Sequence, residues 1–556
     1  MKIAIVGGVA GGASAATRAR RLDEHAEITI YEKGPFVSYA NCGLPYYVGG
    51  QIAESEELLL ETPQSLWDRF RIRTYVGAEV TAIDTDGGRL QGYVSGAAIS
   101  DQFDRLILAP GSVPIAPTFP GTHRDDVFII RTVPDAIRLR EYIESHQVEH
   151  AVVIGAGFIG LEMAEVLHTR SISVTLIERA DQVLPPVDRD IAQYLEDRLP
   201  DLDVRLILSN TVIGIRQGYG RPVIDLSSAP SVSADMIIIG LGVRPSTHLA
   251  QAMGLALGPT GAIHVDERMQ TSHPRIWAAG DAVEKRDWVT GQPRWWPLAG
   301  VANKEGRVAG SNAAGGYATL KGALGTSIVR IAPYVVGVTG LTEKAAHQDR
   351  VGHTVTRVMR GHHAAYYPGA HTLFIKILSD PDSGRLLGAQ VVGEEGVDKR
   401  IDVLATAIGA GMTIDDLAEL DLAYAPPIGA VKDPVIIAGM AASNQRQGLI
   451  ESISADDLET WLTKPNAPFV LDVREVVEAD EFGYIPGAHL IPLNGLRSRI
   501  QEVPTDGPIV TYCRTGHRSY LAARILSQHG RTAVYNLSGG LSVWNLSIRR
   551  RAKPIL

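Results

Sequence analysis

Cysteine is nearly absent from this chain of 556 residues: only Cys42 and Cys513 occur, 471 positions apart (513 − 42). Two distant cysteines cannot form a disulfide-rich framework, so nothing in the sequence points to an oxidising compartment. No run of about 18 uninterrupted apolar residues occurs either, and a transmembrane helix is therefore not predicted. A formal net charge of −9 argues against nucleic acid as a partner, because phosphate binding needs a concentrated basic face.

The N-terminal stretch imitates a signal peptide, with Lys2 followed by IAIVGGVAGGASAA. Glycines interrupt it, however, and it runs directly into Arg18, Arg20 and Arg21, which is wrong for cleavage and export. We therefore expect these residues to form the first strand and helix of a folded, cytoplasmic protein. The chain length predicts three or four domains, because a single core stops growing well below this size.

Residues 2–32 have the parts of a dinucleotide site. KIAIVGG predicts a buried strand and a glycine turn, a helical pattern runs from Gly11 to about Leu22, and the strand EITIYE ends at Glu32. In such a site, glycines allow the tight turn, the N–H groups at the helix N-terminus face the pyrophosphate, and the acidic side chain accepts hydrogen bonds from the ribose hydroxyls. Against G-x-G-x-x-G, Gly7 and Gly12 fit, but Val9 takes the middle position, so this motif alone is weak.

A second copy begins at residue 150 with HAVVIGAGFIGLEMAEVL. Gly155, Gly157 and Gly160 match all three glycine positions, and Glu178 ends the following strand. An acid there repels a 2′-phosphate, so NADH is predicted over NADPH, although Arg179 beside it weakens that preference. Two complete units, 148 positions apart (155 − 7), leave little room for an accidental glycine-rich turn.

Two further segments give the chain a family resemblance: ADMIIIGLGVRPS at 234–246 and IWAAGDA at 276–282. With them, the first 445 or so residues resemble the flavoprotein disulfide reductases that have two dinucleotide-binding domains. The resemblance implies FAD in the first copy and NAD(P)H in the second. The implied cofactor-binding residues are Gly7, Ala10, Gly11, Gly12, Glu32, Lys33, Ala109, Gly111, Arg131, Gly155, Gly157, Phe158, Ile159, Gly160, Glu178, Gly242, Asp281, Leu298 and Ala299.

Familiar members of that family carry a C-x4-C pair, but Cys42 has no partner cysteine nearby. The segment VSYANCGLPYYVGG, residues 37–50, instead resembles the single-cysteine branch. That branch includes NADH oxidase, NADH peroxidase, CoA-disulfide reductase and NADH-dependent persulfide reductase. The resemblance implies that Cys42 is a low-pKa thiolate facing the flavin, cycling through a sulfenic acid or a mixed disulfide.

Two features favour sulfur over oxygen as the substrate. Ser14, Arg18 and Arg21 share a helix face, which in isolation could be an ordinary solvated surface. In CoA-disulfide reductases the matching positions grip coenzyme A. AYYPG (365–369) and AYAPPIGAVKDP (423–434) resemble segments that close the active site of the other subunit in a homodimer. The implied residues are Ser14, Arg18, Arg21, Ser38, Asn41, Arg71, Asn303 and Lys432 for substrate, and Tyr366 or Tyr367 with Tyr424 for catalysis.

Two of these positions depart from the subfamily pattern. Asn303 stands where the subfamily can carry a histidine, and Phe70, with Arg71 beside it, stands where a lysine is expected. A buried tyrosine is also often only part of a core, with its hydroxyl satisfied. These departures bear on how CoA is held and leave the chemistry of Cys42 unaffected.

The last hundred residues restart the strand and helix pattern, with FVLDVRE, GYIPGAHLIPL, PIVTYCRTGHRS and NLSGGLSVWN. This run resembles a rhodanese domain, with Cys513 at the end of a buried strand and ahead of a helix. Loop amides, the helix N-terminus and the side chains of Arg514, His517 and Arg518 are expected to lower the thiol pKa and stabilise a persulfide. A tyrosine phosphatase would need arginine at position 519, which is Ser519.

The predicted fold class is α/β: two Rossmann-like dinucleotide-binding domains, an α+β dimerisation domain and a C-terminal α/β rhodanese domain. The expected limits are 1–114 with 254–325 for FAD, 115–253 for NADH, 326–446 for dimerisation, 447–466 as a linker and 467–556 for rhodanese.

The predicted function is FAD-dependent reduction of persulfides or polysulfide by NADH, with CoA persulfide as the favoured substrate and coenzyme A as a further cofactor. Hydrosulfide and thiol are the products, and the rhodanese domain handles sulfane sulfur. Plain CoA-disulfide reductase, NADH oxidase or peroxidase, and a non-enzymatic redox sensor are the alternatives. No metal site is predicted. The protein is predicted to be a homodimer.

Overall fold

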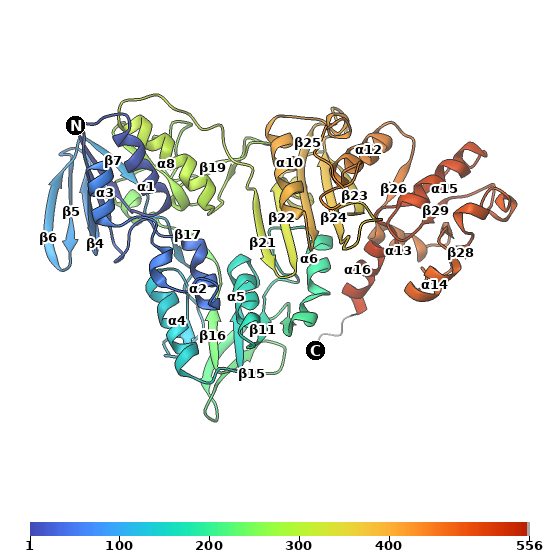
Figure 1. Cartoon of the computed structure of the whole chain (residues 1–556), viewed down its shortest axis with the longest axis horizontal. Coiled ribbons are helices and arrows are strands. Elements are labelled where there is room, and N and C mark those ends of the chain that lie inside the picture. The colour runs from blue at the N-terminus through green and yellow to red at the C-terminus, as the bar shows by residue number, and fades with distance from the viewer. Residues whose placement is uncertain (553–556) are drawn as a thin grey trace. The chain divides into compact units, whose positions relative to one another are not determined.

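The computed structural model describes residues 1–552, and the chain divides into two compact units. The first unit comprises Met1–Asp181 and Leu202–Gly325, and the second comprises Gln182–Asp201 with the chain from Thr326 onward. Figure 1 traces the chain from its blue N-terminus to its red C-terminal helix. None of the described helices is long and apolar enough to cross a membrane.

The first unit opens with a parallel sheet in the order β18-β7-β1-β2-β3. Strand β1 pairs with β2 from Lys2 opposite Glu27 to Val6 opposite Tyr31, and helix α1 connects them. Four of the five residues of β1 are buried, as expected for a parallel strand covered on both faces. The strands are β1 (Lys2–Val6), β2 (Glu27–Glu32), β3 (Ile72–Val76), β7 (Arg105–Leu108) and β18 (Ile276–Ala278), beside an antiparallel sheet of β4 (Ala78–Asp84), β5 (Arg89–Val94) and β6 (Ala97–Gln102).

A second parallel sheet, in the order β12-β11-β10-β16-β9, repeats this plan. Its strands are β9 (Val127–Phe128), β10 (His150–Ile154), β11 (Ser173–Ile177), β12 (Val204–Ile207) and β16 (Met236–Ile239). The smaller sheets pair β13 (Val212–Gln217), β14 (Pro222–Leu226) and β15 (Val232–Ser233), then β8 (Ser112–Pro114) with β17 (Val243–Pro245), and β19 (Lys285–Arg286) with β20 (Pro293–Arg294). Both strand–helix–strand units expected from the sequence are therefore present.

Helices α1 and α8 pack unusually closely in this unit. A Cβ added at Gly306 of α8 would lie 2.2 Å from the carbonyl oxygen of Gly11, so only glycine allows this approach. The contact holds α8 against the first glycine loop. The helices are α1 (Ala10–Arg20), α2 (Leu44–Gly49), α3 (Pro63–Phe70), α4 (Val133–Ser145), α5 (Phe158–Thr169), α7 (His248–Ala252) and α8 (Ala299–Ala313), with 3-10 turns η1 (Asn41–Gly43), η2 (Ser55–Leu58) and η4 (Gly280–Ala282).

The second unit contains an antiparallel sheet in the order β21-β22-β25-β24-β23. The segment 182–201 joins this unit because its Asp188 and Asp190 pair with the buried Lys376 of β24, at 2.9 and 3.1 Å. The strands are β21 (Ser327–Ile331), β22 (Tyr334–Gly340), β23 (Thr354–Gly361), β24 (Thr372–Ser379) and β25 (Leu386–Gly393). The helices are α6 (Arg189–Glu196), α9 (Glu343–Asp349), α10 (Val397–Gly409), α11 (Ile414–Ala418) and α12 (Pro434–Arg446), with η3 (Leu199–Leu202).

The C-terminal part of the second unit is a parallel sheet in the order β26-β30-β29-β27-β28. The sequence expectation of a linker at 447–466 needs correction, because this range contains β26 and α13. Strand β26 pairs with β30 and so belongs to the sheet. The elements are β26 (Glu451–Ile453), β27 (Phe469–Asp472), β28 (His489–Leu490), β29 (Ile509–Tyr512), β30 (Val534–Leu537), α13 (Ala455–Leu462), α14 (Val476–Phe482), α15 (His517–Gln528) and α16 (Gly540–Ala552), with η5 (Leu493–Gly495) and η6 (Ile500–Glu502).

Candidate active site

The two glycine loops of the first unit are built alike. Gly7 and Gly155 have φ values of +95° and +105°, which disfavour any other residue. A Cβ added at Gly12 would lie 1.9 Å from the Gly7 carbonyl oxygen, and one added at Gly160 would lie 1.9 Å from that of Gly155. Each loop therefore requires glycine at both ends for its own backbone.

The middle positions of the two loops differ. A Cβ added at Gly157 would meet no protein atom within 4 Å, so the fold itself does not demand glycine there. The missing side chain leaves space that a pyrophosphate can approach, which fits a bound dinucleotide. In the first loop Val9 occupies this position as the N-cap of α1.

The two acids at the strand ends also make matching contacts. Glu32 accepts hydrogen bonds from the backbone N–H groups of Gly8 and Gly34, both at 2.7 Å. Glu178 accepts from Ala156 and Ala180, both at 2.8 Å. Burial raises the pKa of Glu32, while the two backbone donors oppose that rise. The equivalence of the two copies, from strand to acid, supports two dinucleotide sites.

The turn carrying Asp281 is held by a buried ion pair that sequence reasoning missed. Glu305 of α8 accepts from the backbone N–H of Gly280 at 2.8 Å, and Lys285 donates to the Gly280 carbonyl at 2.6 Å. Burial raises the pKa of Glu305 to about 7 and lowers that of Lys285. Asp281 itself accepts from the Ser112 hydroxyl at 2.9 Å. The only signal in the sequence was a lysine four positions after Asp281.

The remaining predicted cofactor residues lie around these loops. Lys33 pairs on the surface with Glu79 at 2.8 Å, and Arg131 donates to the Ser112 carbonyl at 3.3 Å. The rest sit in turns or helix starts: Ala10 and Gly11 in α1, Ala109 and Gly111 after β7, Phe158 and Ile159 in α5, Gly242 between β16 and β17, and Leu298 and Ala299 at the start of α8.

Cys42 lies in η1, directly before α2, and its side chain is exposed. The low-pKa thiolate expected at Cys42 stays a prediction, and the protein groups around the thiol act against it. The surrounding protein desolvates the thiol, which raises its pKa, and the carboxylates of Glu162 and Asp281 raise it further. Burial in turn raises the pKa of Glu162 to about 7, with Glu165 contributing. The carboxylates of this unit therefore place Cys42 in a negative electrostatic potential.

Several residues predicted to hold coenzyme A make contacts within the first unit. The hydroxyl of Ser14 donates to the amide oxygen of Asn303 at 2.5 Å, and Arg18 donates to Ser311 at 2.8 Å. Arg21 lies over the ring of Phe70 and Arg71 over that of Trp67, at 5.6 and 5.4 Å. Ser38 has a φ of +46°, and the amide of Asn41 reaches both the backbone oxygen and the guanidinium of Arg131.

In the second unit, the predicted tyrosines form an exposed cluster. The hydroxyls of Tyr366 and Tyr424 lie 2.9 Å apart, whereas Tyr367 packs edge-on against His363. Their loops meet where the N–H of Ala364 donates to the carbonyl of Gly429 at 3.0 Å. Tyr366 is 76% exposed, and Lys432 is also exposed. Such aromatic exposure is typical of a surface that a partner covers.

Cys513 follows β29 and is buried within its loop. Its sulfur accepts from the backbone N–H of Gly516 at 3.1 Å and from the Ser519 hydroxyl at 3.6 Å. Arg518 forms a two-pronged pair with Glu478, both bonds at 2.6 Å, which lowers the pKa of Glu478 to about 2. His517 is exposed, and desolvation together with neighbouring cations lowers its pKa.

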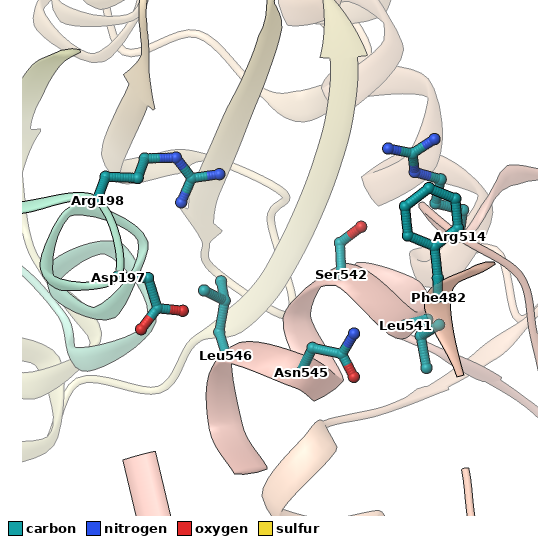
Figure 2. A pocket seen from close by; sticks show the side chains of 8 residues that line it. All are labelled: Asp197, Arg198, Phe482, Arg514, Leu541, Ser542, Asn545 and Leu546. Carbon is teal, nitrogen blue, oxygen red and sulfur yellow. The ribbon is translucent and has the colours of Figure 1, made fainter. Parts of the chain in front are cut away.

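A pocket of about 230 Å³ lies beside this loop (Figure 2). Arg198, just beyond α6, and Arg514 lie on opposite sides of it, with Ser542 of α16 between them. Asp197, Phe482 and Leu541 also line it. Sequence reasoning included Arg514 but missed Arg198, because nothing in the sequence relates residue 198 to the C-terminal sheet.

One group of possible metal ligands occurs among the described residues. Glu343, His347 and His353 have ligand atoms within 4.8 Å of one another. The Glu343 carboxylate already accepts from Lys376 at 2.6 Å and Arg357 at 3.2 Å. This carboxylate serves the buried ion-pair cluster, and we assign no metal to it.

Comparison with known proteins fits this architecture. Residues 1–306 match the pyridine nucleotide-disulphide oxidoreductase family, residues 326–434 match its dimerisation domain, and residues 454–547 match the rhodanese-like domain. The chain belongs to the pyridine nucleotide-disulphide oxidoreductase family. The predicted family and fold class, with a C-terminal rhodanese domain, are therefore confirmed.

Three relatives of this oxidoreductase bear on its function. The NAD(P)H coenzyme A polysulfide/persulfide reductase of Pyrococcus horikoshii is 37% identical over 78% of this chain and 97% of its own. The crystal structure of reduced Bacillus anthracis CoADR-RHD is 41% identical, with a TM-score of 0.96, covering 99% of this chain and 98% of its own. The NAD-dependent persulfide reductase from A. fulgidus is 37% identical, with a TM-score of 0.91, covering 98% and 100%.

Proposed function

We propose that this oxidoreductase binds FAD and uses NADH to reduce persulfides or polysulfide to hydrosulfide and thiol, with CoA persulfide as its preferred substrate. One observation carries the proposal: a lone cysteine accompanies two dinucleotide loops, and a second lone cysteine sits in a rhodanese-type loop. Two of its relatives, a coenzyme A polysulfide/persulfide reductase and a persulfide reductase, point to the same activity. Few cysteines and a net negative charge also fit a cytoplasmic enzyme of small molecules.

The chain's own residues divide the cofactor work. The loop from Gly7 to Gly12 with Glu32 and Asp281 holds FAD, and the loop from Gly155 to Gly160 with Glu178 holds NADH. Once bound, FAD supplies two-electron transfer from NADH. The Lys285–Glu305 pair fixes the turn that presents Asp281.

Cys42 carries the sulfur chemistry. Its thiolate attacks the outer sulfur of R–S–SH, the S–S bond breaks, and R–S⁻ leaves with the bonding electrons. Two electrons derived from NADH then cleave the Cys42 persulfide, regenerating the thiolate and releasing HS⁻. With CoA disulfide the same attack gives a mixed disulfide of Cys42 and CoA and one CoA thiolate. The residues that we assign to substrate binding are Ser14, Arg18, Arg21, Ser38, Asn41, Arg71 and Asn303.

Cys513 receives sulfane sulfur in the C-terminal domain. The Gly516 N–H and the Ser519 hydroxyl point at its sulfur and can stabilise an anionic persulfide. Arg518, although paired with Glu478, also interacts electrostatically with Cys513, and we assign Arg514 and His517 to the same loop as further donors. The exposed Tyr366–Tyr424 pair and Lys432 are the residues that we assign to the site of the partner in a homodimer.

Anaerobic NADH oxidation tests the proposal, with CoA persulfide, CoA disulfide, polysulfide and peroxide compared in wild type, Cys42→Ser and Cys513→Ser. We expect persulfide or polysulfide to give the fastest turnover, and Cys42→Ser to lower it by at least about 10³-fold, because the nucleophile is lost. Cys513→Ser should retain turnover with CoA persulfide supplied directly. If only peroxide or oxygen supports NADH use, the protein is an oxidase or peroxidase instead.

A further inference from the structure

A second pocket, of about 390 Å³, lies within the first unit. Its walls come from the chain at 259–269, from strands β19 and β20, and from the segment 320–323. The volume falls within the range of roughly 300–1,000 Å³ that is typical of ligand sites. None of the lining residues is among those that we assign to contact FAD, NADH or substrate. The pocket is therefore without a role in the proposed function.

The buried pair of Lys285 and Glu305 reaches this pocket. Only one carboxylate oxygen of Glu305 has protein partners: Oε2 accepts from the Gly280 N–H at 2.8 Å and lies 3.6 Å from the Lys285 ammonium. Among the described residues, none donates a hydrogen bond to the other oxygen, Oε1. The side chain is 1% exposed, so bulk water compensates this oxygen poorly. The pocket thus contains a buried acceptor that a ligand with a hydrogen-bond donor can satisfy.

The other charged side chains of the pocket favour a cation as that ligand. Glu284, 6% exposed, accepts from the Thr260 hydroxyl at 2.9 Å and also lines the pocket. Asp266 and Glu267 add two exposed carboxylates. With Glu305 there are four carboxylates in the lining, against the two cations Lys285 and Arg286.

The ammonium group of Lys285 is already engaged within the protein. It donates to the carbonyl oxygens of Gly280 and Val283, at 2.6 and 2.9 Å. Arg286 is exposed to solvent. The negative charge of the pocket is therefore only partly balanced by protein cations.

The remaining lining limits the kind of cation. Three possible metal ligands lie together in the described residues only at Glu343, His347 and His353, so this pocket lacks the spacing for a metal ion. Its apolar walls are formed by Pro259, Val265, Met269, Pro293 and Leu320. A short aliphatic chain that ends in an ammonium group matches both the carboxylates and these walls.

We propose that this pocket binds a small organic cation, a primary amine on a short aliphatic chain. The ammonium group donates to Oε1 of Glu305 and is attracted by Glu284, and the chain packs on Val265 and Leu320. An ammonium group has three donors and makes strong hydrogen bonds with carboxylates. The site is separate from Cys42 and Cys513, so it is tested without any sulfur substrate.

Calorimetric titration of the full-length FAD-containing protein tests the site, at pH 8 and about 0.15 M salt, where attraction between distant exposed charges is screened. The probes are putrescine, 1,4-butanediol and succinate, which share a four-carbon chain and differ in charge. We expect saturable binding of one putrescine for each chain, and none of the other two. Glu284→Gln should raise the dissociation constant about tenfold, because a carboxylate charge is lost. Arg286→Gln should lower it about threefold, because a repelling cation is removed.

Proton release tests the contact with Glu305. Burial raises the pKa of Glu305 to about 7, so the carboxyl is partly protonated at pH 7, and a bound ammonium favours its ionised form. Putrescine should therefore release protons at pH 7, measured from the heats in two buffers of different ionisation enthalpy. Lys285 and Asp281 act on Glu305, and His264 faces the pocket. Glu305→Gln retains these three groups and should abolish the release.

Glu141→Gln, at an exposed carboxylate of α4, is the matched control and should bind putrescine as wild type does. Melting temperature and flavin content equal to wild type exclude misfolding of Glu284→Gln, and Arg286→Gln tests the site at an exposed residue. Equal affinity for putrescine in wild type and both variants overturns the site, as does the absence of saturable binding. Equal binding of 1,4-butanediol or succinate overturns the choice of a cation. Proton release that persists in Glu305→Gln overturns the contact with Glu305.

Discussion

Glu162 and Glu305 are carboxyl groups with pKa values raised to about 7, chiefly by burial. A carboxyl with a raised pKa changes charge near neutral pH, where an exposed glutamate is fully ionised. Glu162 interacts electrostatically with Cys42, and Glu305 hydrogen-bonds to the residue before Asp281. Each of these carboxyls therefore couples pH to a functional residue.

The charge of Glu162 is expected to suppress thiolate formation at Cys42. Ionisation of Glu162 above pH 7 adds a negative charge that raises the pKa of the thiol, so Glu162→Gln should make Cys42 more reactive. We expect alkylation by iodoacetamide at pH 8 to quicken about two- to fivefold, because the thiolate is the reactive form. The two rates should converge below about pH 6, where Glu162 is protonated.

Glu27→Gln is the matched control for that measurement, because Glu27 is an exposed carboxylate of the same unit. It should leave the alkylation rate unchanged at both pH values. A Glu162→Gln rate equal to wild type at pH 8 would show that this carboxylate does not govern Cys42.

At the level of single elements, the conformation of the turn η4 depends on the buried Lys285–Glu305 ion pair. Lys285 and Glu305 bracket the backbone of Gly280 from opposite sides, and Asp281 follows directly. Lys285→Met leaves Glu305 buried without its cation, which relaxes the turn. We expect the dissociation constant of FAD to rise about tenfold, measured by flavin fluorescence on titrating FAD into the protein depleted of it.

Lys304→Met serves as the control, because Lys304 is an exposed residue of α8, the helix that carries Glu305. This variant should bind FAD as wild type does. If Lys285→Met also binds FAD normally, the ion pair is a core feature without a role in presenting Asp281.

At the level of single elements, the sequence predicts those features that are determined within one short segment. The glycine loops were predictable because the constraint lies within the loop, as between Gly12 and the Gly7 carbonyl. The Lys285–Glu305 pair joins two elements through tertiary packing, and no short-range pattern marks it. The sequence predicts a linker at strand β26, because three residues at the edge of a sheet carry too little periodicity to be recognised.

The site residues show the same limit. The resemblance identified Cys42 and Cys513, but charge at Cys42 depends on Glu162, which lies 120 positions away (162 − 42). Likewise Arg198 meets the Cys513 loop only because the segment 182–201 joins the second unit. Electrostatics that arise from packing between distant segments cannot be read from spacing.

For the whole molecule, exposed apolar side chains on the second unit mark the contact that we expect in the proposed homodimer. Ile428 and Val431 are 62% and 72% exposed and lie in the segment of Tyr424. Val431→Asp should shift the protein from dimer to monomer in sedimentation experiments, because a charge buried in the expected interface is costly. NADH-dependent turnover should fall at least about tenfold, since the partner's tyrosines no longer complete the site. Val477→Asp, at a residue 75% exposed on α14, should remain dimeric and active.

The persistence of a fully active dimer in Val431→Asp would place the subunit contact elsewhere. A fully active monomer would remove the need for the partner's residues in catalysis.

Stoichiometry gives the sharpest test of whether NADH reduces sulfane sulfur at Cys42. Anaerobic turnover of CoA persulfide should release one hydrosulfide for each NADH oxidised, because two electrons cleave one S–S bond. Cys42→Ser should release none above the background, and Cys513→Ser should keep the same ratio. NADH oxidation without hydrosulfide, or hydrosulfide release that survives loss of the Cys42 thiol, would show that Cys42 does not reduce sulfane sulfur.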